Sequence, residues 1–277
     1  MKINPLFICL FFILCISSCS KDKGIAEIYY NNPPKDSINF AYRISTLYYF
    51  DEQQKETSFE FTLDTGLLYA WKSVLVNYEG STSAKLYIPE YKNGFITAWV
   101  DFNTAKPIIE FEYVSSSSKF RNLISSIKYY GINNPFALIF NYDSLNLNKI
   151  SRCSLDPETG VIGGVTEDAK FCSNFNIGSC SNSTSSVDYY YGNFTNSLYH
   201  CNELIPFLFI LKNPNQNNLM DILTDLPLYF SKNYPEALVN PSSFSYDFGL
   251  NSEKEPSYFY YRNVPGNVVQ GYNFSMR

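Results

Sequence analysis

The triplet Asp64-Thr65-Gly66 has the residue types best suited to chemistry in this chain. It directly follows residues 59–63, whose alternation of apolar and polar side chains predicts a strand. A carboxylate that activates water needs a rigid support, a neighbouring hydroxyl can brace the turn, and glycine lets backbone and substrate approach closely. Asp and Gly are also ordinary turn formers. The triplet alone therefore leaves both a catalytic carboxylate and a plain turn open.

Several further segments, taken in order, resemble the pepsin-like aspartic peptidases. Trp71 follows Asp64 by seven residues, and Tyr91, Gly94 and Thr97 have the spacing of the family's flap. Later segments similar to the family are residues 159–165, 225–230, 241–246 and 266–274. The resemblance implies an all-β, bilobal pepsin-like aspartic peptidase fold. It also implies an aspartic endopeptidase that binds extended polypeptide in a cleft between the lobes.

The resemblance assigns roles to five residues. Asp64 and Asp188 are expected to be the catalytic pair, because this chemistry needs one ionised and one protonated carboxyl group. Thr65, Gly66 and Tyr91 are expected to contact the substrate. The chain contains no second Asp-Thr-Gly or Asp-Ser-Gly, and tyrosines follow Asp188 where the family has Thr and Gly. We therefore expect a degenerate member whose proteolytic activity the missing motif puts in question, and Asp188 also fits an ordinary polar loop.

Charge and composition exclude several other classes of function. The net charge of −5, with no dense Lys/Arg run, argues against a nucleic-acid partner. The single histidine, His200, removes His-rich metal clusters, and the absence of a C-x₂-C pair argues against zinc. Neither a dinucleotide fingerprint nor a phosphate-binding loop is present. We expect no metal and no cofactor.

The N-terminus is typical of an export signal. Lys2 precedes eleven residues, 6–16, that are almost entirely apolar, and small residues then lead to Cys19. Because a membrane-spanning helix needs about 20 apolar residues, residues 1–19 are expected to be a signal peptide and the mature protein to be secreted without a membrane span. Residues 16–19 also match the bacterial lipobox. The alternative is therefore a lipoprotein anchored at Cys19 to the bacterial outer membrane.

Four cysteines remain outside the N-terminal segment: Cys153, Cys172, Cys180 and Cys201. An even number in an exported protein predicts two disulfides. The sequence leaves the three possible pairings open.

The composition favours β structure, with 24 Tyr, 23 Phe and an aromatic fraction of 18%. Strands are predicted at residues 40–50, 59–63, 85–88, 94–102, 107–114 and 137–141, with a hairpin connection at 51–56. Residues 173–186 are predicted to be a polar loop, and residues 217–223 one or two helical turns. The tyrosine runs 189–191 and 258–261 either pack between sheets or line a binding cleft.

The expected organisation is a signal peptide (1–19), an N-terminal linker (20–36), a first β lobe (37–170) and a second, shortened β lobe (171–277). Two functions remain. The first is a secreted, monomeric peptidase homologue that binds polypeptide. The second is a bacterial surface lipoprotein with a β-sandwich and a ligand-binding or adhesin role.

Overall fold

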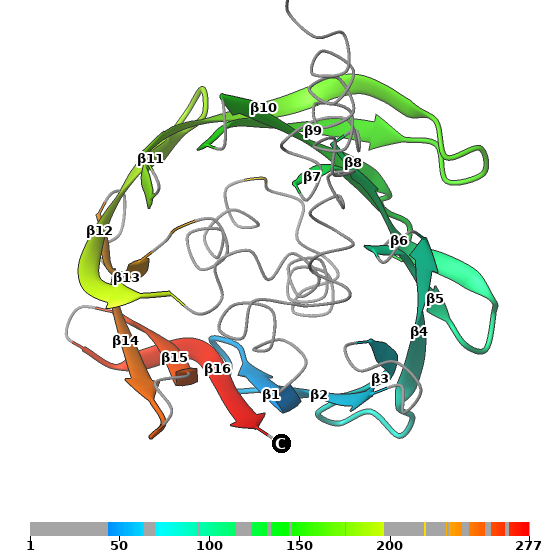
Figure 1. The fold of residues 1–277 in the computed structure, drawn as a ribbon, viewed down its shortest axis with the longest axis horizontal. Helices are drawn as coiled ribbons and strands as arrows, with labels where there is room; N and C mark the ends of the chain where they lie inside the picture. Colours follow the sequence, from blue (N-terminus) through cyan, green and yellow to red (C-terminus); the bar gives the residue numbers. More distant parts are fainter. Residues whose placement is uncertain are drawn as a thin grey trace, which may run out of the picture.

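Sixteen antiparallel strands, joined edge to edge, make up the barrel of this protein (Figure 1). The computed structural model describes residues 44–63, 70–92, 95–114, 123–131, 134–143, 146–174, 176–196, 219, 231, 233–239, 244–252, 256–263 and 266–276. The strands are β1 Ile44–Phe50, β2 Glu56–Leu63, β3 Trp71–Tyr78, β4 Lys85–Lys92, β5 Phe95–Asp101, β6 Lys106–Tyr113, β7 Ile124–Tyr129, β8 Phe136–Asp143, β9 Asn146–Leu155, β10 Ile162–Asn174, β11 Asn176–Ser181, β12 Ser186–Thr195, β13 Asn233–Val239, β14 Phe244–Leu250, β15 Pro256–Arg262 and β16 Val268–Met276.

The sheet closes on itself because β1 pairs with β16, while every other pairing joins strands adjacent in sequence. Figure 1 shows the blue first strand beside the red last strand. At this seam Leu47 lies opposite Phe274, and the Ser45 hydroxyl donates to the Ser275 carbonyl oxygen at 2.9 Å. Closure gives both terminal strands a hydrogen-bonding partner, so the barrel presents no open sheet edge.

The prediction of an all-β chain is confirmed, but the bilobal pepsin-like fold is wrong. A single closed barrel replaces the two lobes, and it also replaces the β-sandwich of the alternative. The expected boundary between residues 170 and 171 lies inside β10, which pairs with β9 on one side and β11 on the other. The period-2 pattern is common to sandwiches, lobed folds and barrels, so it did not distinguish them.

Buried hydrogen bonds fasten one end of β11 and β12. The wholly buried Ser231 accepts the Ile177 N–H at 3.0 Å through its hydroxyl, which also lies 2.9 Å from the Tyr191 hydroxyl. Tyr191 donates to the Ile177 carbonyl oxygen at 2.6 Å, and the Asn196 side-chain amide donates to the Ser231 carbonyl oxygen at 2.9 Å. Burial raises the pKa of Tyr191.

The prediction of two disulfides finds no support in the described residues, where Cys153, Cys172 and Cys180 are free thiols. Cys172 lies opposite Ser179 and Cys180 opposite Phe171, so adjacent register positions direct the two sulfurs to opposite faces of the wall. A disulfide needs Cβ atoms about 4 Å apart, which opposite faces do not permit. Cys201 lies outside the described residues.

The predicted signal peptide and linker, residues 1–36, also lie outside the described residues, so both remain predictions. Among the residues that are described, no helix is long and apolar enough to cross a membrane.

Candidate functional site: the two faces of the barrel wall

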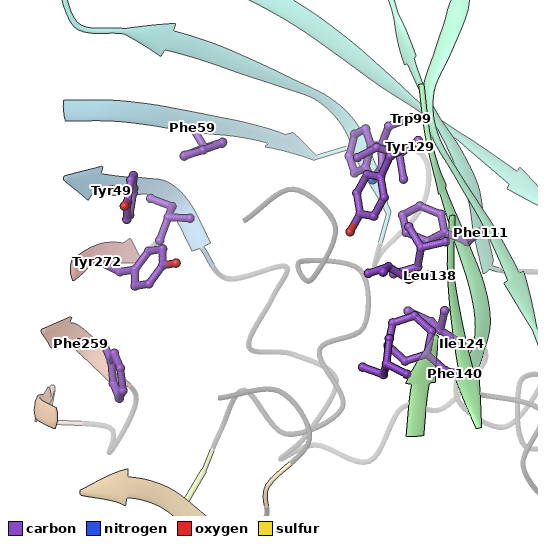
Figure 2. Packing of buried hydrophobic residues seen from close by; sticks show 14 of the residues in the cluster. Tyr49, Phe59, Trp99, Phe111, Ile124, Tyr129, Leu138, Phe140, Phe259 and Tyr272 are labelled. Atoms are coloured by element: carbon purple, nitrogen blue, oxygen red, sulfur yellow. The ribbon is translucent and has the colours of Figure 1, made fainter. Parts of the chain in front are cut away.

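The inner face of the wall is apolar and rich in aromatic rings. Figure 2 shows side chains from strands on opposite sides of the barrel pointing into its interior. The labelled ones are Tyr49, Phe59, Trp99, Phe111, Ile124, Tyr129, Leu138, Phe140, Phe259 and Tyr272. All are at most 5% exposed and belong to one hydrophobic cluster. The described inner wall is therefore packed like a core, unlike the polar lining of a water-filled channel.

The strand register makes this inner face continuous from strand to strand. Tyr49 lies opposite Tyr272, which lies opposite Phe259, and the rings of Tyr49 and Tyr272 are 5.2 Å apart between centroids. Directly paired residues share a face of the sheet, so one inward ring places its partners inward as well. Trp71 and Trp99 extend the aromatic contacts at 5.8 Å.

Charged residues also occur on the mostly apolar inner face, and Arg152 and Glu167 form a directly opposed pair there. Arg152 pairs with inward-facing Leu138, and its guanidinium lies 4.4 Å from the centre of the Phe136 ring. Glu167 lies opposite Arg152 and accepts the backbone N–H of the wholly buried Leu219 at 3.2 Å. Burial lowers the pKa of Arg152, and the nearby Glu167 charge opposes that shift. The pair thus places polar groups on a mostly apolar surface, where Glu167 bonds to the Leu219 backbone and Arg152 packs on the Phe136 ring.

The outer face carries charged side chains. Because side chains alternate across a strand, a residue between two inward positions points outward. Glu110 lies between Ile109 and Phe111, and Lys128 lies between Ile127 and Tyr129. The same alternation places outward Glu60, Lys149, Asp168, Lys170, Asp247 and Arg262.

Ion pairs connect neighbouring strands on this outer face. Lys128 Nζ lies 3.9 Å from Glu110 and 3.6 Å from Glu112. Lys149 Nζ lies 3.0 Å from Asp168, whose pKa is lowered chiefly by a hydrogen bond from the Ser151 side chain. Such partly exposed ion pairs contribute at most about 1 kcal/mol each to the stability of the fold. They show mainly that the outer face carries groups that water solvates well.

Part of the outer face is aromatic. Tyr258 and Tyr260 of β15 stack at 4.5 Å between ring centroids, and Phe50 of β1 meets Tyr260 edge-on at 5.5 Å. Phe259, between the two tyrosines, points inward in Figure 2. The tyrosine run at 258–261 therefore divides between the two faces. All four residues are aromatic, so the sequence did not show which of them point to each face.

The residues assigned to a peptidase site are only partly placed. Asp64, Thr65 and Gly66 lie outside the described residues. Asp188 lies in β12 on the outward side, opposite Ser179. The Tyr91 hydroxyl accepts the Trp71 N–H at 2.8 Å and donates to the Trp71 carbonyl oxygen at 3.2 Å, so it bonds to backbone. No group of three or more His, Cys, Asp or Glu in the described part could hold a metal ion.

Solved structures with a similar fold are porin-like proteins. One from Bacteroides uniformis ATCC 8492 has a TM-score of 0.51 and 11% identity, covering 84% of this chain and 98% of that chain. One from Bacteroides vulgatus ATCC 8482 has a TM-score of 0.48 and 8% identity over the same shares. This likeness shows a fold. No family model and no curated protein matches the chain.

These findings correct the resemblance. The similar structure is a porin-like protein and the fold is a closed barrel, so the pepsin-like aspartic peptidase assignment is wrong. The classification as a proteolytic hydrolase, which followed from that assignment, is wrong as well. The pairing of Asp64 with Asp188 rested on that resemblance, because the short motifs around them are individually unspecific.

Proposed function

We propose that this chain is a bacterial surface lipoprotein that binds ligands through the water-facing wall of its barrel, and that a lipid on Cys19 holds it at the outer membrane. The charged outer face is the observation that carries the proposal. The similar fold of the porin-like protein from Bacteroides uniformis supports an envelope location.

The outer face is a poor match for lipid. A barrel that spans a bilayer presents an apolar band outward, and a Lys or Arg at the centre of that band costs about 2–4 kcal/mol. Here Glu60, Glu110, Asp168 and Asp247 stand near the middle of their strands and point outward. Lys128 and Lys149 accompany the carboxylates. Moving these charged side chains into hydrocarbon would cost far more desolvation free energy than the attraction within the ion pairs contributes.

The inner face argues against a channel. Phe59, Trp99, Ile109 and Tyr129 are wholly buried apolar or aromatic side chains, so these positions of the inner wall do not line a water-filled passage. The outer wall and the ends of the barrel remain as the surfaces for binding.

Phase partition in Triton X-114, after expression of the full chain in a Gram-negative host, tests the proposal. Wild type is expected in the detergent phase with a diacylglyceryl group on Cys19 by mass spectrometry. Cys19→Ala is expected in the aqueous phase, whereas Cys15→Ala, in the same N-terminal segment, should behave as wild type. Cys19→Ala that has lost its signal peptide by mass spectrometry and still stays in the detergent phase would show a membrane-spanning barrel, and wild type in the aqueous phase would show that no anchor forms. Either result overturns the proposal.

A further inference from the structure

The outward aromatic cluster, defined as Phe50, Tyr258 and Tyr260, lies beside two glycines of the neighbouring strands. Gly249 is opposite Tyr258, and a Cβ on Gly249 would overlap the Tyr258 ring. Gly271 is opposite Tyr260, and a Cβ there would come within 2.5 Å of the Tyr260 ring. Rings that rest on glycine backbone lose motional freedom. The cluster is therefore preorganised, which lowers the entropic cost of binding a ligand.

Polar groups border the cluster on the same face. The Tyr260 hydroxyl donates to the Asn273 side-chain oxygen. Asp247, opposite Tyr260, accepts from Arg262 Nε at 3.1 Å and from Nη2 at 2.7 Å. Both members of this ion pair keep about a third of their side chains exposed, at 35% and 36%. Donors and acceptors are thus available to a ligand beside the rings.

The charge balance of this patch limits the class of ligand. Arg262 is neutralised by Asp247, so no excess cation is available for a phosphate or another polyanion. A lipid chain would cover the ion pair and the Asn273 amide without replacing their hydrogen bonds to water, which is costly. A sugar ring meets both conditions, because its C–H face packs on aromatic rings while its hydroxyls bond to amide, carboxylate and guanidinium groups.

We propose that the aromatic cluster, with Asn273, Asp247 and Arg262, is a binding site for neutral polysaccharide. The site rests on the proposed function, since a glycan reaches it only if the outer wall stands in water. Binding is expected to be modest for one sugar ring and stronger for a polymer, because a chain presents many rings to the site.

Affinity electrophoresis of the full-chain Cys19→Ala protein through gels containing amylopectin, laminarin, galactomannan or xyloglucan tests the site. At least one polymer is expected to slow the protein. Tyr258→Ala, which removes a stacked ring, should weaken retardation about tenfold or more. Tyr258→Phe keeps the ring and should retain binding. The matched control is Tyr190→Ala, which removes a 58% exposed outward tyrosine on β12 and should change nothing.

Phe50→Ala removes another ring of the cluster and should also weaken retardation. This variant replaces Tyr258→Ala in the test if circular dichroism shows that Tyr258→Ala is unfolded. Migration unaffected by all four polymers overturns the site, as does retardation that persists in folded ring-removal variants. These failures are distinguishable from failure of the proposed function, because phase partition reports the anchor and the wall whether or not any polysaccharide binds.

Discussion

At the scale of single residues, neighbouring side chains in one strand lie on opposite faces of the barrel wall. In β15, Phe259 packs into the barrel while Tyr258 and Tyr260 lie on its outer surface. Gly271 is part of the same arrangement, because the Tyr260 ring occupies the space that a side chain would need. A single methyl group at this position therefore disturbs both the wall and the aromatic cluster.

Gly271→Ala is expected to lower the free energy of unfolding by about 1–3 kcal/mol, the usual cost of overpacking. The new Cβ would stand 2.6 Å from the Phe259 carbonyl oxygen, which the strand pairing holds in place. Urea unfolding followed by circular dichroism measures the change. Gly164→Ala is the matched control, since a Cβ there meets nothing within 4 Å. Equal stability of the two variants would contradict the packing described at Gly271.

At the scale of elements, the sequence predicted individual strands better than their assembly. Residues 85–88 and 107–114 lie within or close to β4 and β6, and the connection after residue 50 joins β1 to β2 as predicted. The polar stretch 173–186 was predicted to be a loop but contains β11. Its serines and asparagines gave no alternating apolar pattern, and pairing with β10 and β12 overrides that weak local preference.

The candidate site was less predictable than the strands. The run at 258–261 was visible as aromatic sequence, but its polar neighbours Asp247 and Asn273 come from β14 and β16. The register that brings them beside Tyr258 and Tyr260 depends on pairing that no local signal encodes. The Asp64 motif, in contrast, was conspicuous locally but lies outside the described residues, so its role stays a prediction.

The buried bonds around Ser231 provide a test at this scale. Ser231→Ala would leave the Ile177 N–H and the Tyr191 hydroxyl without this partner. A buried group left unsatisfied costs about 1–3 kcal/mol, so the free energy of unfolding should fall by that amount. Ser83→Ala, at an exposed turn position, is the control and should be neutral. A neutral Ser231→Ala would show that water or another group replaces the hydroxyl.

At the scale of the whole molecule, buried tyrosines make the barrel sensitive to alkali. Burial raises the pKa of Tyr78 from 10.0 to about 12, and it also raises the pKa values of Tyr129 and Tyr142. In the unfolded chain these groups ionise near their ordinary pKa of about 10. The unfolded state therefore releases protons first, and the stabilisation that is complete below pH 10 is lost as the pH rises toward 12 and beyond.

We expect unfolding in alkali to coincide with tyrosine ionisation. Absorbance at 295 nm should rise partly near pH 10, from exposed tyrosines, and the remainder should rise together with the loss of the far-ultraviolet circular dichroism signal. Complete ionisation of the 24 tyrosines while the β signal persists would contradict the burial described here.

The seam between β1 and β16 has a consequence for how the chain reaches its folded state in the cell. The two serines that meet across it, Ser45 and Ser275, are 230 residues apart in the chain. During synthesis the first strand emerges long before its partner exists, and until then its unpaired edge is free to pair with other chains. Hairpins such as β9–β10 need only local contacts, whereas the seam must wait for the last strand. Folding should therefore be limited by one late closing event, and holdase chaperones would act on the open sheet before it.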